Sequence, residues 1–236
     1  MDWEKSAAAW IEAQGEHGDF SRRRVLDAPM IERVRACRPR RLLDLGCGEG
    51  RFCRLLDSMV AECVGLDPTP SLIARARDLG GAHFVEGRAE NLPFESASFD
   101  VVVSYLSLLD IEKIDAALDE VRRVLHPGGH FLIANLTGFA TAADIKGGGW
   151  SVRADGSREI VVQRYLEPHA ILSEWKGISV TNWHRPLSFY MRALLDRGFQ
   201  LCHFDEPAVV NPGHPKEAAY NNAPYQQIME WQVPSL

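Results

Sequence analysis

The stretch that most constrains the fold is residues 42–52, which read L-L-D-L-G-C-G-E-G-R-F. A short apolar run leads into three alternating glycines and then into a helix-compatible pattern, which predicts a strand, a tight turn and a helix. Gly46, Gly48 and Gly50 have no Cβ atom, so this turn can adopt positive φ and a ligand can lie directly against the main chain. N–H groups at the start of the following helix are free to bind an anionic group there.

Asp44, two residues before the first glycine, restricts which ligand fits. Its carboxylate would repel a pyrophosphate and attract an ammonium group. The dinucleotide fingerprint G-x-G-x-x-G also requires a glycine at position 51, where this chain has Arg51. The segment D-L-G-C-G-E-G resembles the first motif of the class I S-adenosylmethionine (SAM) methyltransferases, whose ligand has a zwitterionic methionine end. The alternative is a tight turn in another Rossmann-like domain.

Further motifs extend this resemblance over residues 41–135. A second apolar run ends in Asp67, 23 residues after Asp44, and this spacing of about one strand–helix–strand unit brings both strand ends to one edge of a sheet. The family's ribose-binding acid stands here, which implies ribose binding by Asp67 and adenine contacts from Pro68 and Thr69. The alternative role for this segment is capping of the next helix. The later phrases N-L-P-F and H-P-G-G-H-F-L-I match the family in the same order.

The chain departs from the family pattern at Arg88. The family usually has an acid there, which accepts a hydrogen bond from the adenine amine, and a guanidinium cannot accept one. Adenine would then be bound by the backbone N–H of Ala89 and by stacking, or by Glu90 if the turn is shifted. Ser104 and Tyr105 follow the next apolar run and are predicted at the carboxyl edge of the sheet, where ligands bind in open α/β folds.

Apolar residues at helical spacing predict an amphipathic helix over residues 3–14. Its two tryptophans either pack on the domain surface or form a cap over the ligand. A second helix is predicted to begin at Asp19 or Ser21, both of which are good capping residues, and a third is predicted over residues 28–37.

The segment that contains Arg22 and Arg23 adds the last expected cofactor contact. Related methyltransferases often begin with a helix and a polar turn near the methionine end of the cofactor, which implies that one of these guanidinium groups binds the cofactor carboxylate. The implied cofactor is SAM, and the product is S-adenosylhomocysteine. The residues predicted to contact it are Asp44, Gly46, Cys47, Gly48, Gly50, Asp67, Pro68, Thr69, Arg88, Ala89, Glu90, Ser104, Tyr105 and Arg23.

Residues 138–186 are predicted to form an insertion, because a bare connection of that length between two strands is uncommon. Alternating runs over 160–165 and 178–183 predict two antiparallel strands, with a turn at 155–156 and a flexible link at 147–149. By resemblance, such an insertion shapes the acceptor pocket. Its aromatic residues suit an apolar or aromatic small molecule, or else form the insertion's own core. They are Trp150, Tyr165, Trp175 and Trp183.

The segment H-R-P-L-S-F-Y resembles a recurrent segment of small-molecule methyltransferases that faces the substrate cavity. It implies His184 as a general base, with His17 and Tyr190 as the other candidates and a structural role for the histidine as the alternative. No metal site is predicted, because no convincing acidic cluster surrounds Asp110. Residues 104–107 do not resemble the N-P-P-Y segment of enzymes that methylate nucleic-acid bases, which argues against a nucleic-acid substrate.

Composition predicts a cytoplasmic protein that acts on a small molecule. The chain of 236 residues has a formal charge of −6 and 46% apolar residues, which gives no general attraction to nucleic acid or to an anionic membrane. It has no apolar stretch of about 18 residues and no signal-peptide pattern. The five cysteines form no C-x-x-C pair, which predicts reduced thiols and no zinc site. The sequence does not distinguish a monomer from a homodimer.

The predicted fold is α/β, a doubly wound seven-stranded Rossmann-like methyltransferase sheet in a single domain. Residues 1–38 would form a helical cap, 39–137 and 187–236 the SAM-binding core, and 138–186 an antiparallel lid. The predicted function is transfer of a methyl group from SAM to O, N or C of a small-molecule acceptor, by resemblance to the ubiquinone and menaquinone biosynthesis type. The alternatives are a SAM-binding protein without methyl transfer and a nucleotide-dependent oxidoreductase, which the first motif disfavours.

Overall fold

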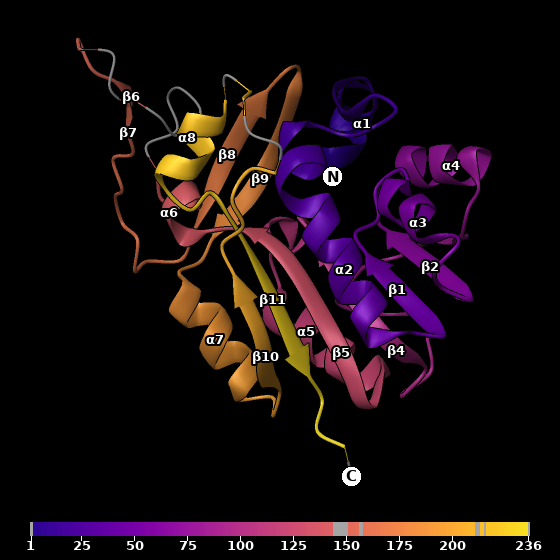
Figure 1. The fold of residues 1–236 in the computed structure, drawn as a ribbon. Coiled ribbons are helices and arrows are strands. Elements are labelled where there is room, and N and C mark those ends of the chain that lie inside the picture. Colours follow the sequence, from indigo (N-terminus) through magenta and orange to yellow (C-terminus); the bar gives the residue numbers. More distant parts are fainter. Residues whose placement is uncertain (1, 144–150, 156–157, 211–212, 215, 236) are drawn as a thin grey trace.

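The computed structural model describes residues 2–143, 151–155, 158–210, 213–214 and 216–235. Within them, a seven-stranded sheet has the strand order β10-β11-β5-β4-β1-β2-β3 and is flanked by helices (Figure 1). The predicted doubly wound α/β fold is confirmed. The strands of this sheet are β1 Arg41–Leu45, β2 Glu62–Asp67, β3 His83–Glu86, β4 Phe99–Tyr105, β5 Leu125–Leu136, β10 Gln200–Asp205 and β11 Gln226–Gln232.

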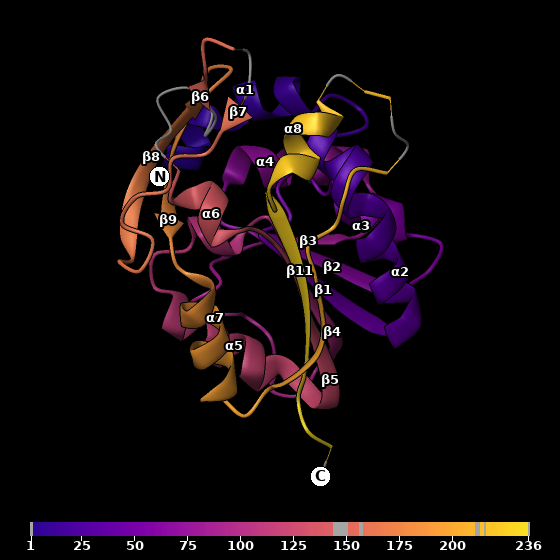
Figure 2. The ribbon, with the colours of Figure 1, turned by 60° about the vertical axis from the view of Figure 1, so that its left-hand side comes forward.

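Both faces of the sheet are covered, because successive side chains along a strand point to opposite sides. Leu43 and Leu45 of β1 pack in one apolar core with two helices, α5 (Ile114–Val124) and α7 (Leu187–Leu195). Leu42 packs in a second core with α2 (Asp27–Cys37), α3 (Arg51–Leu56) and α4 (Pro70–Leu79). Figure 2 shows α5 and α7 on one side of the sheet and α2 and α3 on the other. The helices, including the π-helix η1 and the 3-10 helix η2, are α1 Asp2–Gln14, η1 Arg22–Leu26, α2 Asp27–Cys37, α3 Arg51–Leu56, α4 Pro70–Leu79, η2 Leu108–Asp110, α5 Ile114–Val124, α6 Gly138–Thr141, α7 Leu187–Leu195 and α8 Glu217–Asn222.

Parallel pairing in the middle of the sheet brings the predicted functional residues to one edge. In register, Asp44 of β1 lies opposite Val103 of β4, and Asp67 of β2 lies opposite Glu86 of β3. The C-terminal strand β11 runs antiparallel between β5 and β10. The carboxyl ends of β1, β2 and β4 therefore form a common edge, which is where open α/β sheets bind ligands.

The predicted second and third helices are in fact one continuous helix over residues 20–37. The side chain of Asp19 accepts a hydrogen bond from the backbone N–H of Arg22 (2.9 Å) and caps the start of this helix, as one of the two predicted caps. The segment Arg22–Leu26 is wound as a π-helix, in which Arg22 is buried and Arg23 is exposed. The continuous winding decides which of the two arginines faces the interior.

The insertion contains an antiparallel hairpin, but only one of its strands lies where the alternation placed it. Strand β9 (Ile178–His184) agrees with the prediction, whereas its partner is β8 (His169–Trp175), and residues 160–165 contribute only an isolated bridge. The turn explains the correction. Lys176 and Gly177 both have positive φ (45° and 79°), and such a two-residue turn matches the twist of the strands that it joins.

A second, shorter antiparallel pair precedes this hairpin. It consists of β6 (Ser151–Val152) and β7 (Arg158–Glu159). The predicted flexible link at 147–149, together with Trp150 and Gly156, lies outside the described residues.

Helix α1 and the β8–β9 hairpin lie together beyond the carboxyl edge of the sheet (Figures 1 and 2). Ser6 of α1 donates its hydroxyl to the carbonyl of Ser179 in β9 and accepts the N–H of the same residue, both at 3.1 Å. At the other side, Glu4 of α1 accepts the N–H of Ser71 in α4 (3.2 Å). The helix thus joins the insertion to the core. None of the helices in the described part of the chain has the length and apolar character needed to cross a bilayer.

Candidate active site

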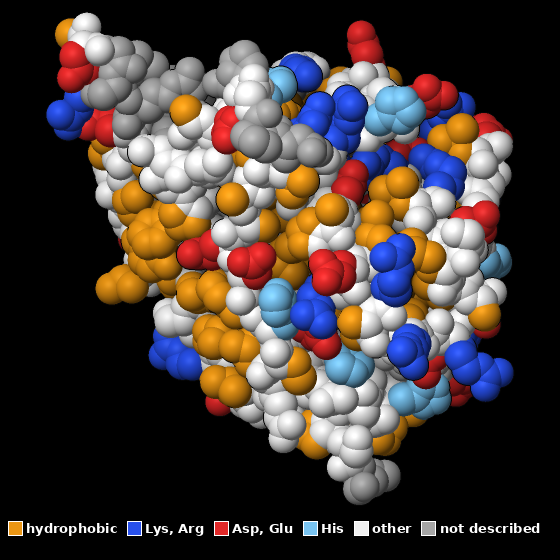
Figure 3. Space-filling view, in the orientation of Figure 1, with side chains coloured by type: hydrophobic (Ala, Val, Ile, Leu, Met, Phe, Trp, Pro, Cys, Tyr) orange, Lys and Arg blue, Asp and Glu red, His pale blue; other side chains and the backbone are white. Residues whose placement is uncertain are grey.

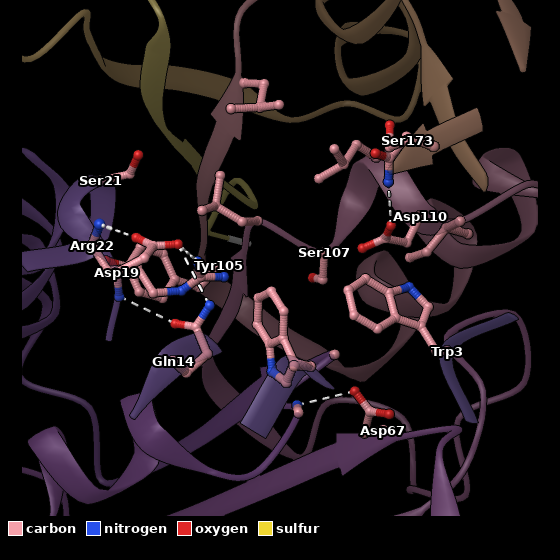
Figure 4. A pocket seen from close by; sticks show the side chains of 18 of the residues that line it. Trp3, Gln14, Asp19, Ser21, Arg22, Asp67, Tyr105, Ser107, Asp110 and Ser173 are labelled. Atoms are coloured by element: carbon pink, nitrogen blue, oxygen red, sulfur yellow. Dashed lines mark hydrogen bonds and ion pairs between the residues drawn. The ribbon is translucent and has the colours of Figure 1, made fainter. Parts of the chain in front are cut away.

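A cavity of about 760 Å³ opens at the carboxyl edge of β1, β2 and β4. Its floor is the glycine loop after β1, and its walls come from α1, η1, η2 and the β8–β9 hairpin. Figure 4 shows side chains from these separate elements pointing into the same space. Its volume lies in the range of enclosed small-molecule sites.

The glycine loop forms as predicted, but its three glycines have different roles. At Gly46 (φ +76°), a Cβ atom would lie 2.4 Å from the Cβ of Ser107, so this residue allows two backbone segments to meet. Gly48 lines the cavity, and a Cβ there would meet nothing closer than a Trp10 nitrogen at 3.7 Å. Gly50 packs against a phenylalanine and does not line the cavity, so the structure corrects its predicted direct contact with the cofactor.

Asp44 is buried at the base of the cavity. Cys53 donates its thiol to Asp44 Oδ2 (3.4 Å), while Asp44 Oδ1 has no hydrogen-bond partner within the described structure. Burial raises the pKa of Asp44 to about 7, and the nearby Asp67 adds repulsion in the same direction. A buried acceptor without a donor is costly, so this oxygen is suited to a positively charged ligand group.

Asp67 lies beside the same loop and already holds it in place. Its Oδ2 accepts the N–H of Gly48 (3.0 Å), and its Oδ1 accepts the N–H of Thr69 (2.9 Å). Burial raises the pKa of Asp67. The Thr69 side chain adds a third hydrogen bond to this carboxylate. A carboxylate has about four lone-pair sites, so one acceptor site remains for a ligand hydroxyl. The ligand-binding and helix-capping interpretations of this segment are therefore compatible.

The predicted adenine region also lines the cavity. Ala89 is buried and lies beside the cavity with Pro68 and Thr69. Arg88 is exposed at the rim and forms an ion pair with Glu90 (3.2 Å). The arginine that breaks the family pattern thus lies at the mouth of the cavity.

At the opposite end of the cavity, Arg22 takes the position that was predicted for Arg22 or Arg23. Its guanidinium pairs with Asp19 (2.6 Å) and lies 4.8 Å from the ring centre of Trp10. Arg23 is exposed and does not line the cavity, so the structure gives no support to its predicted cofactor contact. Helical geometry accounts for the difference, because neighbouring residues of a helix point in different directions.

The turn after β4 is shared between the cavity and the core. Tyr105 lines the cavity and donates its hydroxyl to Asp27 Oδ1 (2.7 Å). Ser104 is buried beneath the cavity wall, where its hydroxyl lies 2.7 Å from that of Ser107. Ser107 lines the cavity in its place and donates to the carbonyl of Leu45. Ser104 therefore does not face the cavity itself, and the hydroxyl at this position of the wall is that of Ser107.

None of the three predicted catalytic residues lines the cavity. His184 is buried, with Nδ1 2.7 Å from the Thr141 hydroxyl and Nε2 2.7 Å from the carbonyl of Tyr165. Burial lowers its pKa, so it is neutral, and its Nε2–H donates to that carbonyl. His17 is exposed outside the cavity, and Tyr190 is buried away from it. The structure therefore corrects the prediction and gives His184 a structural role.

Two residues that were not predicted to be functional meet in the cavity. Asp110 of η2 accepts a hydrogen bond from Asn182 Nδ2 of β9 (2.5 Å), and Trp3 of α1 also bonds to this carboxylate. Asp110 and Asn182 are 72 positions apart, so no local pattern could have joined them. The only available signal was the position of Asp110 after the fourth strand, at the edge where ligands bind.

One group of metal-type side chains occurs among the described residues, and it lies outside this cavity. It consists of Cys37, His130 and Glu230. Glu230 is already paired with Arg33 (3.0 Å) and His130 (2.8 Å). A guanidinium on the same carboxylate disfavours a bound cation, so this group is best described as an ion-pair network.

Comparisons with known proteins agree with the motifs and the fold. Residues 43–133 match a family model described as a methyltransferase domain. The solved structure of an S-adenosylmethionine-dependent methyltransferase from Mesorhizobium loti superposes with a TM-score of 0.76 and 26% sequence identity. The match covers 92% of this chain and 100% of that one.

Curated relatives match over a shorter region. The phthiotriol/phenolphthiotriol dimycocerosates methyltransferase of Mycobacterium leprae is 39% identical over 102 residues, or 41% of this chain and 38% of that protein. The malonyl-[acyl-carrier protein] O-methyltransferase of Methylococcus capsulatus is 36% identical over 114 residues, or 46% of this chain and 41% of that protein. The chain thus spans about two-fifths of the length of these relatives. The glycine-loop motif, the seven-stranded sheet and these matches together show that residues 43–133 match a methyltransferase domain and that the chain is similar to S-adenosylmethionine-dependent methyltransferases.

Proposed function

We propose that this protein transfers the methyl group of SAM to a nucleophilic atom of a small-molecule acceptor. The observation that carries this proposal is the continuity of the cavity, which runs from the acids at the strand ends to a chamber under α1 and the β8–β9 hairpin. That chamber is lined by aromatic side chains, which suits an apolar or aromatic acceptor. They include Trp3, Trp10, Trp183 and Tyr225.

The described cavity residues fit SAM. The unpartnered Asp44 Oδ1 can accept the cofactor ammonium, and Arg22 can bind its carboxylate. Asp67 has an acceptor site left for a ribose hydroxyl, Ala89 lies in the adenine region, and the open space beside Gly48 allows close approach to the main chain.

The residues of this chain would contribute mainly by aligning the two reactants and by excluding water from the cavity. Bound SAM supplies an electrophilic methyl group on a sulfonium, which needs little activation. Tyr105 and Ser107 line the cavity beside the glycine loop. The aromatic side chains of α1 exclude water and hold the acceptor in line. Such alignment can supply roughly 7–11 kcal/mol of the rate acceleration.

The surface supports a small molecule over a nucleic acid. On the face shown in Figure 3, Lys and Arg side chains are interspersed with Asp and Glu, and no broad basic surface appears. Within the cavity, the guanidinium groups of Arg22, Arg51 and Arg88 are each paired with a carboxylate. Nucleic-acid binding relies on clustered unpaired cations. The quinone-biosynthesis subtype, the cap and lid boundaries and the cytoplasmic location remain predictions.

Two measurements test the proposed function. Calorimetric titration should show binding of SAM and S-adenosylhomocysteine but not of NAD. Incubation with SAM and a panel of phenols, alcohols and amines should release S-adenosylhomocysteine, detected by mass spectrometry. Absence of SAM binding by folded protein would contradict the proposal. Binding without turnover across the panel would favour a SAM-binding protein that does not transfer methyl.

The affinity for S-adenosylhomocysteine should rise about tenfold between pH 5.5 and pH 7. Asp44 has a raised pKa of about 7 in the free protein, so at low pH it must lose a proton before it can pair with the ligand ammonium. The variant Asp44→Asn should bind more weakly and show no such rise, whereas Asp57→Asn, at an exposed position after α3, should behave as wild type. Calorimetry at several pH values measures both effects. An unchanged pH dependence in Asp44→Asn would refute the assignment.

A further inference from the structure

Asp110 occupies a distinctive position in the cavity. It ends η2, which follows β4, and β4 lies next to the strand β1 that carries Asp44. Figure 4 shows its carboxylate on the far side of Ser107 from the Arg22–Asp19 pair, next to Trp3 and across the cavity from Asp67. It therefore lies between the cofactor region and the acceptor chamber.

Two elements that enclose the cavity both donate to this carboxylate. Asn182 of β9 donates its amide N–H to Oδ1 (2.5 Å), and Trp3 of α1 supplies the second hydrogen bond. Neither donor carries a charge. A carboxylate held by two neutral donors is fixed in place but keeps acceptor sites for a further group.

No ion pair forms on Asp110 within the described structure. Arg22 faces it from η1 but is engaged by Asp19, and Arg185 donates to the backbone carbonyls of η2 and the residues that follow it. Burial raises the pKa of Asp110 to about 8, with added repulsion from Asp67 and opposing effects of its two hydrogen-bond donors and of Arg22. A positive charge that arrives in the cavity would favour its ionised form.

Other candidate proton acceptors in the acceptor chamber are less suitable. Burial raises the pKa of Tyr225 to about 12, so its hydroxyl stays protonated near neutral pH. Glu112 and Glu174 are exposed at the rim, and Glu174 accepts from a serine hydroxyl. Ser107 already donates to a backbone carbonyl. Among the described residues that face the chamber, Asp110 is the enclosed carboxylate that can accept a proton from the methyl acceptor.

We propose that Asp110 is the catalytic base of this cavity, and that the acceptor is therefore a neutral compound with an O–H or N–H group rather than a carboxylate. This inference rests on the proposed function. An anionic acceptor would be repelled by Asp110 and by Asp67, whereas a hydroxyl or amine can donate its hydrogen to the open acceptor site.

Methyl transfer with Asp110 as the base involves one bond formed, one bond broken and one proton transferred. The acceptor oxygen or nitrogen forms a bond to the methyl carbon, and the carbon–sulfur bond breaks with its electron pair left on sulfur. The acceptor's proton passes to the Asp110 carboxylate and then to solvent. The cationic donor favours the ionised carboxylate beforehand, so the base becomes competent when SAM is bound.

The first test needs no acceptor. At pH 7.5, a carboxyl group with a pKa of about 8 is about three-quarters protonated, so SAM should displace roughly half a proton more on binding than S-adenosylhomocysteine, which lacks the sulfonium charge. Calorimetry in two buffers of different ionisation enthalpy counts these protons. The difference should vanish in Asp110→Asn and persist in Glu112→Gln, an exposed carboxylate two residues away. An equal difference in wild type and Asp110→Asn would overturn the proposal.

The second test uses defined acceptors: catechol and 2-naphthol against benzoate and hexanoate. The phenols should be methylated and the carboxylates should not. Asp110→Asn should lower kcat about 10²–10⁴-fold, while Asp110→Glu restores part of it. The wild-type kcat should rise with pH on its acidic limb, and this rise should be absent in Asp110→Asn.

These outcomes separate the two proposals. Faster turnover of the carboxylates, or near-wild-type kcat in Asp110→Asn, would overturn the role of Asp110. If SAM binds but none of the probes reacts, the proposed methyl transfer is contradicted, and the proton count still decides whether Asp110 faces the donor. If SAM does not bind, both proposals fail at the first step.

Discussion

Replacing Asp67 by asparagine will weaken binding of S-adenosylhomocysteine about a hundredfold, which is roughly 2.7 kcal/mol of binding free energy. The reason is the number of acceptor sites. The N–H groups of Gly48 and Thr69 and the Thr69 side chain occupy three acceptor sites of the carboxylate, which leaves one for a ribose hydroxyl. An amide keeps only one acceptor oxygen, and its NH₂ group would face a backbone N–H. Calorimetric titration at pH 7.5 measures the loss.

The matched control is Glu86→Gln. Glu86 lies opposite Asp67 in the register of β2 and β3, at the same edge of the sheet, but it is exposed and does not line the cavity. Removal of an exposed charge has little effect, so this variant should bind within about twofold of wild type. Equal losses in the two variants would mean that the general negative charge of this edge, and not a specific contact, attracts the ligand.

Replacing Gly50 by alanine will lower the free energy of unfolding by roughly 2–4 kcal/mol. The new Cβ would lie 2.5 Å from the ring of Phe84 and 3.2 Å from Ala76, at a φ of +80°. The ring of Phe84 is buried, so it cannot move aside without disturbing the core that α3 and α4 share with the sheet. Urea denaturation followed by circular dichroism measures the change.

The comparison variant for this loop is Gly48→Ala. Its Cβ would enter open space beside the cavity at a φ of +56°, so the expected stability loss is only roughly 1–2 kcal/mol. Its affinity for S-adenosylhomocysteine should nevertheless fall at least about tenfold, because the methyl group would occupy the space where the ligand approaches the main chain. Equal stability losses with unaltered affinity would show that Gly48, like Gly50, only supports the turn.

Most of the central sheet could be predicted because its signals are local. Each parallel strand is a short apolar run, and each is followed by a turn or helix with its own start signals. The alternating glycines require backbone angles and close approaches that few other residues allow, so the turn after β1 was recognisable from eleven letters. The acid at the end of β2 followed from the length of one strand–helix–strand unit.

The insertion shows where local patterns are insufficient. Residues 160–165 and 178–183 both alternate, yet only the second run forms a strand of the β8–β9 hairpin. Val161 and Val162 are exposed, so the apolar residues of the first run have no buried surface to pack against. The Lys176–Gly177 turn selected the strand nearest in sequence instead, because a tight turn fixes the register of the two strands that it joins.

The sequence by itself determined the sheet, the glycine loop and the acids that flank the expected cofactor. Only the tertiary structure decided which polar groups face the cavity: Arg22 in place of Arg23, and Asp110 in place of His184. The physical reason is that an ionisable side chain acquires its chemistry from burial and from partners remote in sequence. His184 is engaged by Thr141 and a backbone carbonyl, whereas Asp110 is held by donors from α1 and β9 and keeps an acceptor site.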